Sequence, residues 1–333
     1  MAVKVGDFVA GQDQIIAVRG WATSLWVEMR PWQWVKNLSV LAPLLFSQNL
    51  FVPVAVEQAT VAFVLFCLLS SSIYLLNDIM DCAQDRLHPQ KCHRPLAAGE
   101  LSMSAALGVM IALLFCALVG GVMLSQTFAL TLLGYWLINV LYSAWLKHQV
   151  ILDVFALASG FVFRVVGGAV ATQVEISHWL LLCTTLLALF LGFSKRRHEL
   201  VLLGEEAEAH RQVLGEYNPH FLDMMIGVVT ASTVMSYALY TVSEETVRKF
   251  HTQGLLLTLP FVLYGIFRYL YLVYHKDQGG DPTQILLTDK PLVINLCLGT
   301  HSGRDSILAV GAREEKHESY SCGVEDYSAD GAG

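Results

Sequence analysis

The residues of this sequence that could do chemistry lie together in the segment Asn77-Asp78-Ile-Met-Asp81-Cys-Ala-Gln-Asp85. At about 100° per residue, a helix would bring the amide and the carboxylates to one side. Three carboxylates at this spacing repel one another unless a cation lies between them. Because the segment follows a long apolar run, where charge is costly, we predict a magnesium site for a phosphorylated substrate at a membrane surface. Asp78, Asp81 and Asp85 are the predicted metal ligands and catalytic residues.

Positive charge follows this acidic cluster. Arg86, Lys91 and Arg94 come in the next loop, so they can return to the carboxylates. A helix end that runs into a solvated charged loop is the plain alternative, but it requires neither the one-sided spacing nor the cations. Carboxylates for a metal, followed by lysine and arginine for phosphate, are the parts that a diphosphate site needs.

The composition indicates a membrane protein. The chain has 333 residues, of which 55% are hydrophobic and 15% charged, and its mean hydropathy is +0.52. A soluble protein would carry about 25% charged residues. The net charge of −7 says little about the body of the chain, because much of the acid falls between Glu314 and Asp330. We expect no nucleic-acid partner, since its binding would need a basic stripe.

Apolar runs of membrane length predict the elements that must position the site. We expect an all-α helical bundle with eight transmembrane helices, near residues 38–55, 58–77, 102–124, 127–146, 151–171, 178–195, 221–243 and 253–274. The first run is the least regular, because Pro43 and Pro53 interrupt it. Lysine and arginine concentrate in the N-terminal segment and after the even-numbered runs, whereas the alternate loops hold only Arg248 and Lys249. By the positive-inside rule, the N-terminus and the acidic cluster face the cytoplasm, in an inner cell membrane.

The C-terminal part breaks this pattern. Residues 291–298 resemble the start of a ninth span, but a stretch of eight apolar residues cannot cross a bilayer. We expect a lost or altered ninth helix and a polar, disordered tail at 299–333, produced by a shifted reading frame or kept as a natural regulatory tail. The predicted domains are a cytoplasmic segment at 1–36, a catalytic membrane domain at 37–298, and this tail.

Two neighbouring patterns point to a family. Asn77-Asp78-x-x-Asp81-x-x-x-Asp85, followed by Arg94-Pro95-Leu96-x-x-Gly99, resembles the first signature of the UbiA superfamily of intramembrane prenyltransferases. The likeness covers roughly residues 25–295. It implies a UbiA-like helical bundle in which the aspartates bind magnesium that holds a diphosphate.

Further stretches resemble one branch of that superfamily, decaprenyl-phosphate phosphoribosyltransferase and its relatives. They are Arg30-Pro-Trp-Gln-Trp-Val-Lys36-Asn37, Tyr142-Ser-x-x-Leu-Lys147-His148, Asp153 through Ser159-Gly160-Phe161 to Arg164, and Lys195-Arg196-x-x-Glu199-Leu200. Aromatic prenyltransferases of the superfamily carry a second acidic motif where this chain has Lys195-Arg196-Arg197. One acidic and one basic motif can hold more phosphate, which favours phosphoribosyl diphosphate and a polyprenyl phosphate as substrates.

The resemblance and the positions of the polar residues together define the expected substrate contacts. The predicted substrate-binding residues are Lys36, Asn37, Asn77, Arg94, Tyr142, Lys147, Arg164, Lys195 and Arg196. Some have a structural alternative. Arg164 could form a buried pair with Asp153, with which it shares a helix face, and Lys36 could be a membrane anchor. Arg268 could face a cavity or reach the membrane interface.

The basic segment at the end of the sixth run has its own expected contacts. Glu199 is spaced to pair with Lys195 and to orient it. Arg197 and His198 are expected to face solvent or lipid headgroups.

We therefore expect transfer of a 5-phosphoribosyl group from phosphoribosyl diphosphate to decaprenyl phosphate, with release of pyrophosphate. By the same resemblance, the product would feed the synthesis of arabinan-type precursors of the cell envelope. Prenyl transfer to an aromatic acceptor is the alternative within the superfamily, and the basic segment argues against it. A transporter or a lipid-binding protein is a third possibility, disfavoured because the polar residues gather at one membrane face. A homo-oligomer is one possible assembly.

Overall fold

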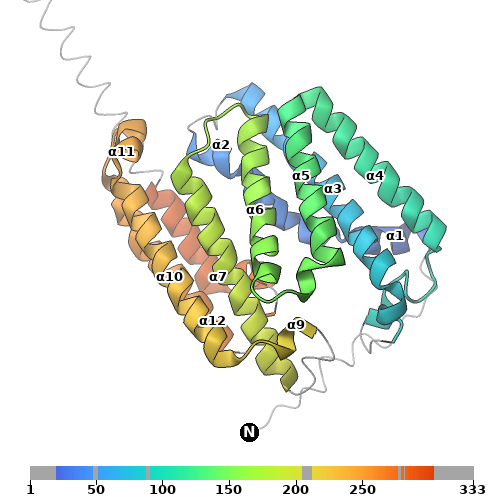
Figure 1. Ribbon diagram of the computed structural model, residues 1–333. Helices are drawn as coiled ribbons and strands as arrows, with labels where there is room; N and C mark the ends of the chain where they lie inside the picture. Colours follow the sequence, from blue (N-terminus) through green and yellow to red (C-terminus); the bar gives the residue numbers. More distant parts are fainter. Residues whose placement is uncertain are drawn as a thin grey trace, which may run out of the picture. The chain divides into compact units, whose positions relative to one another are not determined.

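The computed structural model describes residues 20–47, 52–87, 91–204, 212–276, 279–280 and 282–303. Throughout these residues the regular secondary structure is helical, which confirms the predicted all-α class (Figure 1). The chain divides into two compact units. The first runs to Ala144 and includes Phe163–Glu175, whereas the second holds Trp145–Val162 and the chain from Ile176 onward.

The first unit is built around one long helix, α3. Its elements are α1 (Trp21–Met29), η2 (Pro31–Leu41), α2 (Ala42–Phe46), α3 (Pro53–Asp85), η4 (Lys91–His93), α4 (Met103–Leu124), α5 (Gln126–Ala144) and the last part of α6 (Leu152–Ala171). Helices α3, α4 and α5 pack side by side (Figure 1). Between them Phe66 lies edge-on to Phe128 and Tyr135, and all three are buried. This core holds the end of α3, and with it the acidic cluster, in a fixed place.

The predicted first span, 38–55, is wrong as a single helix. Residues 31–41 form a 3-10 helix, and α2 is a separate five-residue helix. Pro31, Pro43 and Pro53 each lie in the first turn of an element. Because proline lacks an N–H and fits only the first turn of a helix, the chain begins a new element at each one.

The second unit is a bundle in which α7 and α10 run along one another. Its elements are η5 (Leu146–His148), the first part of α6, α7 (His178–Leu203), α9 (Gln212–Gly215), α10 (Pro219–Val242), α11 (Glu244–Phe250), η7 (Gly254–Thr258), α12 (Leu259–His275), α13 (Pro282–Thr288) and the helical residues 290–303. Its core includes Val154, Phe190, Leu222 and Tyr269.

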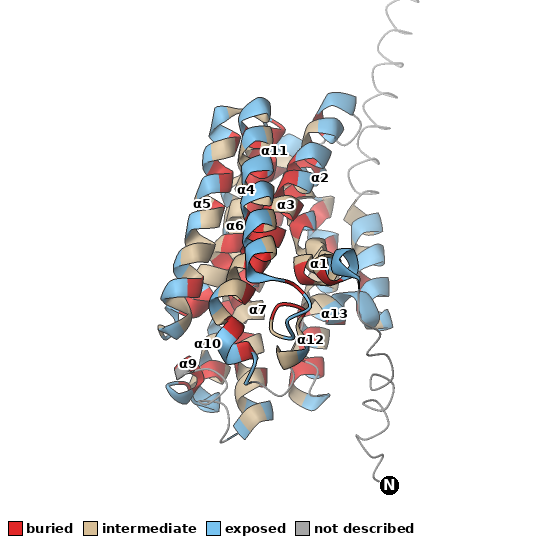
Figure 2. Cartoon of the chain, turned by 90° about the vertical axis from the view of Figure 1, so that its right-hand side faces the viewer, coloured by how far each residue is buried: buried red, intermediate tan, exposed pale blue. Residues whose placement is uncertain are grey.

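Seven helices among the described residues are long and apolar enough to cross a membrane: Pro53–Asp85, Met103–Leu124, Gln126–Ala144, Leu152–Ala171, His178–Leu203, Pro219–Val242 and Gly254–His275. They correspond to seven of the eight predicted spans. Large apolar side chains are exposed along them, for example Ile111, Phe115 and Val122 on α4, whose outer face is pale blue in Figure 2. An exposed apolar surface of this kind suits lipid, so the chain is an integral membrane protein.

Residues 290–303 form more helix than the predicted eight-residue stretch. Asp289 starts this helix by accepting the Leu292 N–H (3.0 Å), and Asn295 Nδ2 donates to the Phe261 carbonyl on α12 (2.8 Å). A Cβ on Gly299 would lie 3.1 Å from Phe261. The helix thus packs closely on α12 and continues past the predicted boundary at 298; residues 304–333 of the predicted tail lie outside the described part.

Candidate active site

The acidic cluster lies in the last turns of α3, as predicted. Asp78 and Asp85 are almost completely buried, whereas Asn77 and Asp81 are partly exposed. A helix places residues seven apart on nearly the same line, which explains why the two buried carboxylates face the same way. Helix periodicity therefore puts the two buried carboxylates on one side of α3.

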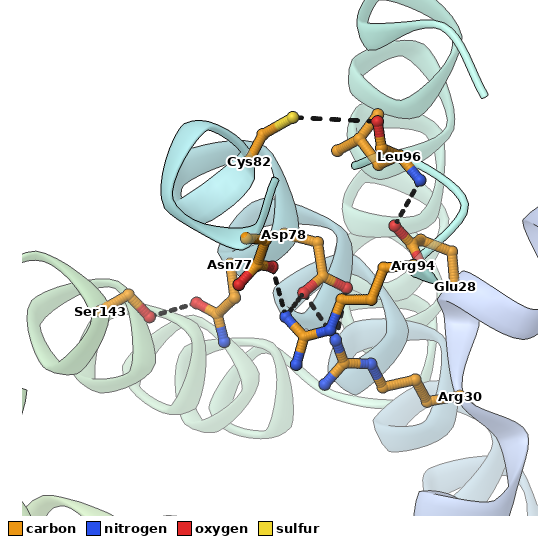
Figure 3. Close-up of polar contacts among 9 residues, drawn as sticks. Glu28, Arg30, Asn77, Asp78, Cys82, Arg94, Leu96 and Ser143 are labelled. Atoms are coloured by element: carbon orange, nitrogen blue, oxygen red, sulfur yellow. Dashed lines mark hydrogen bonds and ion pairs between the residues drawn. The ribbon is translucent and has the colours of Figure 1, made fainter. Parts of the chain in front are cut away.

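Two arginines bind these carboxylates. Arg94 Nη1 lies 2.8 Å from Asp78 Oδ1 and 2.6 Å from Asp85 Oδ2. Arg30 Nη2 lies 2.6 Å from each oxygen of Asp78, and its guanidinium is stacked over the Tyr74 ring. Figure 3 shows both arginines converging on Asp78 from different elements. The predicted return of Arg94 to the acids is found in the structure, whereas the role of Arg30 was missed.

The loop that carries Arg94 is shaped by its own sequence. Ala98 N–H donates to the Arg94 carbonyl (2.8 Å), and Glu100 N–H donates to the Pro95 carbonyl (2.9 Å). Gly99 has a φ of +79°, a conformation that favours glycine. The Arg94-Pro95-Leu96-x-x-Gly99 pattern thus encodes a tight turn that directs the Arg94 side chain toward α3.

Helix α1 is fastened over this loop. Ser24 Oγ donates to Glu100 Oε2 (2.9 Å), and the buried Glu28 accepts the Leu96 N–H at Oε1 (3.3 Å; Figure 3). Burial and, to a smaller extent, the charge of Asp78 raise the pKa of Glu28, whereas the charge of Arg30 lowers it. The net result is a pKa of about 7. Glu28 is a buried acid next to the site that sequence analysis did not identify. Its only sequence signal is that it lies two residues before Arg30.

The amide of Asn77 is held from α5. Ser143 Oγ donates to Asn77 Oδ1, and the Ser143 side chain is buried (Figure 3). The neighbouring Tyr142 and, on η2, Lys36 are partly buried and make contacts of their own. Ser143 thus fixes the orientation of the first residue of the acidic motif.

The donor set suits magnesium. Mg²⁺ prefers oxygen ligands, and the cluster offers carboxylate and amide oxygens only. Asp78 and Asp85 already converge on one positive atom, Arg94 Nη1, so a cation is favoured at this point. Within the described ranges no three His, Cys, Asp or Glu side chains are arranged to hold a metal. Metal binding would therefore require Arg94 to share or release Asp85.

Arg164 is a buried cation in the interior of the first unit. Its Nε donates to Asn37 Oδ1 (2.7 Å), and its Nη2 donates to the Tyr135 hydroxyl (2.6 Å). The Asn37 amide nitrogen donates in turn to Ser70 Oγ (3.1 Å) and to Cys67 Sγ (3.3 Å). Asn37 is fully buried and holds Arg164 in place; its predicted contact with a substrate stays a prediction.

The alternative pairing of Arg164 with Asp153 is wrong. Asp153, in the second unit, binds Arg196 Nε through Oδ2 (2.6 Å) and accepts the Tyr217 hydroxyl at Oδ1 (2.8 Å). Helix periodicity places Asp153 and Arg164 on one face of α6. Each of them nevertheless pairs with a residue of another element, Asp153 with Arg196 and Arg164 with Asn37.

Arg196, a predicted substrate-binding residue, is buried against two carboxylates, and its contact with a substrate stays a prediction. Its side chain is 1% exposed, and its Nη1 lies 2.5 Å from Glu199 Oε2. Lys195 is 38% exposed, and its Nζ lies 3.8 Å from Glu199 Oε1, so the predicted i,i+4 pair is confirmed. Lys195 and Lys147, the latter on η5, are both only partly buried.

The expectation that Arg197 and His198 face solvent is wrong. Arg197 Nε lies 2.6 Å from Asp223 Oδ1, and its guanidinium is 3.8 Å from the centre of the Tyr274 ring. His198 is buried and accepts the Gly279 N–H at Nδ1 (3.2 Å). Helices α10 and α12 cover this side of α7, which the local sequence does not reveal.

Arg268 has a carboxylate partner at the start of helix 290–303. Its Nη2 lies 2.8 Å from Asp289 Oδ2, and its guanidinium lies over Tyr271. The Arg268 hydrogen bond lowers the pKa of Asp289. This pair ties α12 to the start of helix 290–303.

Comparison with known proteins identifies relatives over about four fifths of the chain. A sequence model of the UbiA prenyltransferase family matches residues 38–286. The decaprenyl-phosphate phosphoribosyltransferase of Corynebacterium glutamicum is 34% identical over 277 residues, which cover 80% of this chain and 81% of that protein. The enzyme of the same name from Mycolicibacterium smegmatis is 33% identical over 280 residues, covering 80% of this chain and 86% of its own.

Solved structures show the same fold. A UbiA homolog from Archaeoglobus fulgidus, bound to GPP and Mg²⁺, superimposes with a TM-score of 0.66 at 20% identity. The alignment covers 85% of this chain and 99% of that one.

Proposed function

The chain belongs to the UbiA prenyltransferase family, and from this premise we propose that it transfers a 5-phosphoribosyl group from phosphoribosyl diphosphate to decaprenyl phosphate. The observation that carries the proposal is the 34% identity to decaprenyl-phosphate phosphoribosyltransferase over four fifths of both chains. The partly exposed Lys195 of α7 supports the same donor, because a sugar phosphate brings more negative charge than a prenyl diphosphate alone.

The reaction is a substitution at the anomeric carbon of the donor. An oxygen of the lipid phosphate forms the new bond to this carbon, and the bond to the diphosphate breaks, so that pyrophosphate leaves. Because the lipid phosphate is already anionic, no strong general base is needed. The main task of the protein is to stabilise charge on the leaving group, which is usually the largest catalytic contribution.

We assign the metal to Asp81 and Asp85, with Asn77 beside them. Magnesium, when bound there, would supply positive charge to the diphosphate. Asp78 differs from the other two, because both of its oxygens contact arginines. We therefore propose that Asp78 holds Arg30 and Arg94 beside the metal, where their remaining N–H groups can donate to phosphate oxygens.

The other proposed substrate contacts involve side chains that are partly exposed. Lys36, Tyr142, Lys147 and Lys195 are partly exposed, and we propose that they contact the ribosyl phosphate or the lipid phosphate. Apolar helix faces open to the bilayer would admit the polyprenyl chain. The distribution of lysine and arginine supports an inner-membrane protein with its site on the cytoplasmic side.

The test is transfer by the purified protein in detergent. With magnesium, labelled phosphoribosyl diphosphate and decaprenyl phosphate, we expect label in the lipid, and removal of magnesium with a chelator should abolish it. Asp81→Asn should abolish transfer, whereas Glu57→Gln, an exposed acid at the other end of α3, should not. If no lipid is labelled but a prenyl group passes from a prenyl diphosphate to a phenolic acid, the proposed donor is wrong.

A further inference from the structure

We propose that four residues around the start of α6 and the end of α7 position Lys195 to bind a phosphate group of a substrate. We call Tyr217, Asp153, Arg196 and Glu199 the α7 network. The inference rests on the proposed function and deepens it, since it names the group that meets the phosphate and the groups that act only through it.

The buried end of the network is rigid. Asp153 is fully buried, and its two oxygens are used by different partners, Arg196 and Tyr217. Tyr217 also accepts the Ile151 N–H (2.6 Å), where the backbone is left-handed with a φ of +68°. Burial, with the charge of Asp153, raises the pKa of Tyr217, so its hydroxyl stays protonated and donates. The hydrogen bonds therefore fix both the turn before α6 and the Asp153 carboxylate.

Arg196 connects the buried Asp153 to the partly exposed Glu199. Its side chain is 1% exposed and contacts the two carboxylates through different nitrogens. The planar guanidinium fixes the direction of both contacts, which a flexible ammonium group could not do. Glu199, 22% exposed, is consequently held from the interior at Oε2.

The other oxygen of Glu199 faces Lys195, the most exposed member of the chain of contacts. The Lys195 ammonium lies 3.8 Å from Glu199 Oε1. At this distance the contact is an ion pair and not a hydrogen bond, so the three donors of the ammonium group can serve a phosphate. Charges alternate along the series from Asp153 to Lys195, so each ionic group is stabilised by its neighbour.

A purely structural role explains these contacts less well. Buried ion pairs often add little net stability compared with apolar side chains of similar volume. This network, moreover, does not end in the interior but on a partly exposed lysine. Ordering a long lysine side chain in advance reduces the entropy lost when it binds a ligand.

The phosphate that Lys195 meets could belong to either substrate, so the experiment measures both. The variants are Lys195→Ala, Glu199→Gln, their double variant and Tyr217→Phe, with KM and kcat determined separately for phosphoribosyl diphosphate and for decaprenyl phosphate. We expect Lys195→Ala to raise KM for one substrate about tenfold or more. Glu199→Gln should raise the same KM less, and the double variant should equal Lys195→Ala, because residues that act through one another are not additive.

Two controls separate positioning from folding. Glu244→Gln removes a matched i,i+4 partner from Arg248 on exposed α11, and it should leave both KM values unchanged. Lys195→Arg keeps a cation and should restore part of the affinity. Tyr217→Phe should raise the same KM as Glu199→Gln, because it loosens Asp153 without removing a charge.

The outcomes distinguish this proposal from the proposed function. Additive effects of Lys195→Ala and Glu199→Gln, or unchanged KM values in an active Lys195→Ala enzyme, would overturn the network alone. Failure of the wild type to transfer would count against the proposed function. Equilibrium binding of each labelled substrate, measured without its co-substrate, still tests Lys195 in that case. If Lys195→Ala binds one substrate more weakly than the wild type does, the result supports the network. If Lys195→Ala binds both substrates as tightly as the wild type, the network is rejected.

Discussion

Asp78 and Asp81 are three residues apart, yet the structure gives them different surroundings. Asp78 is buried between Arg30 and Arg94, whereas Asp81 is partly exposed on the same side of α3. Removing one partner from a buried ion pair costs about 3–5 kcal/mol. We therefore expect Asp78→Asn to lower both the melting temperature and the transfer rate.

Asp81→Asn is the matched comparison for Asp78→Asn. It should abolish magnesium-dependent turnover while changing the melting temperature little. Thermal unfolding in detergent without magnesium, followed by the transfer assay, measures both properties. An Asp78→Asn protein as stable as the wild type would contradict the assignment of Asp78 to the arginines.

Glu28 should make stability depend on pH near neutrality. Its pKa rises from 4.5 to about 7 in the folded protein, chiefly through burial. A raised pKa means that the protonated Glu28 side chain stabilises the folded protein. This stabilisation is complete below pH 4.5, the ordinary pKa, and is lost as the pH rises through about 7. We expect Glu28→Gln to be more stable than the wild type at pH 8 and to lose this advantage toward pH 5. Melting temperatures across this range measure the effect, and Glu57→Gln, an exposed acid, should show no such trend.

At the scale of elements, the close approach of α6 to η2 depends on a glycine. A Cβ on Gly168 would lie 1.9 Å from the Val40 carbonyl oxygen, a backbone atom that cannot turn away. Gly168→Ala should therefore force η2 away from α6 and lower the melting temperature by several degrees, since overpacking costs about 1–3 kcal/mol or more. Gly108 on α4 has nothing within 4 Å of the same position. There the alanine should stabilise the helix by about 0.5–1 kcal/mol, and equal effects at the two sites would contradict the packing argument.

Helix 290–303 shows how one element depends on a distant one. Its first turn is capped by Asp289, which Arg268 of α12 holds in place, and Asn295 and Gly299 lie against the same helix. The apolar pattern at 291–298 predicts only a fragment because it contains the polar Asn295 and ends at Gly299. Against α12, these same residues permit close packing, as small and hydrogen-bonding side chains do between membrane helices.

For the whole molecule, the arrangement of charged loops predicts which parts face the cytoplasm. His93, in the loop after α3, and Arg248, on α11, fall on opposite sides in the positive-inside scheme. In a background without native cysteines, His93→Cys should react with a membrane-impermeant maleimide only in inside-out vesicles. Arg248→Cys should react only in right-side-out vesicles. Labelling of both variants from one side would overturn the proposed orientation.

The sequence by itself determined the membrane class, the family, and the placement of the acidic cluster on one side of a helix. These properties depend on composition and on spacing along the chain, such as the seven-residue separation of Asp78 and Asp85, which helix geometry converts directly into position. The turn at Arg94-Pro95-Leu96-x-x-Gly99 belongs to the same class, since its hydrogen bonds are local.

Only the tertiary structure decided which charged groups meet. Arg30 binds Asp78, Arg164 binds Asn37, and Arg196 binds Asp153, all between residues far apart in the sequence. Periodicity states which face of a helix a residue occupies, but not which neighbouring helix covers that face. For this reason Arg196, predicted to meet a phosphate, is a buried bridge, and Glu28 was not recognised as an acid beside the site. A buried charge must find its partner across the packed interface, and the packing alone settles which partner that is.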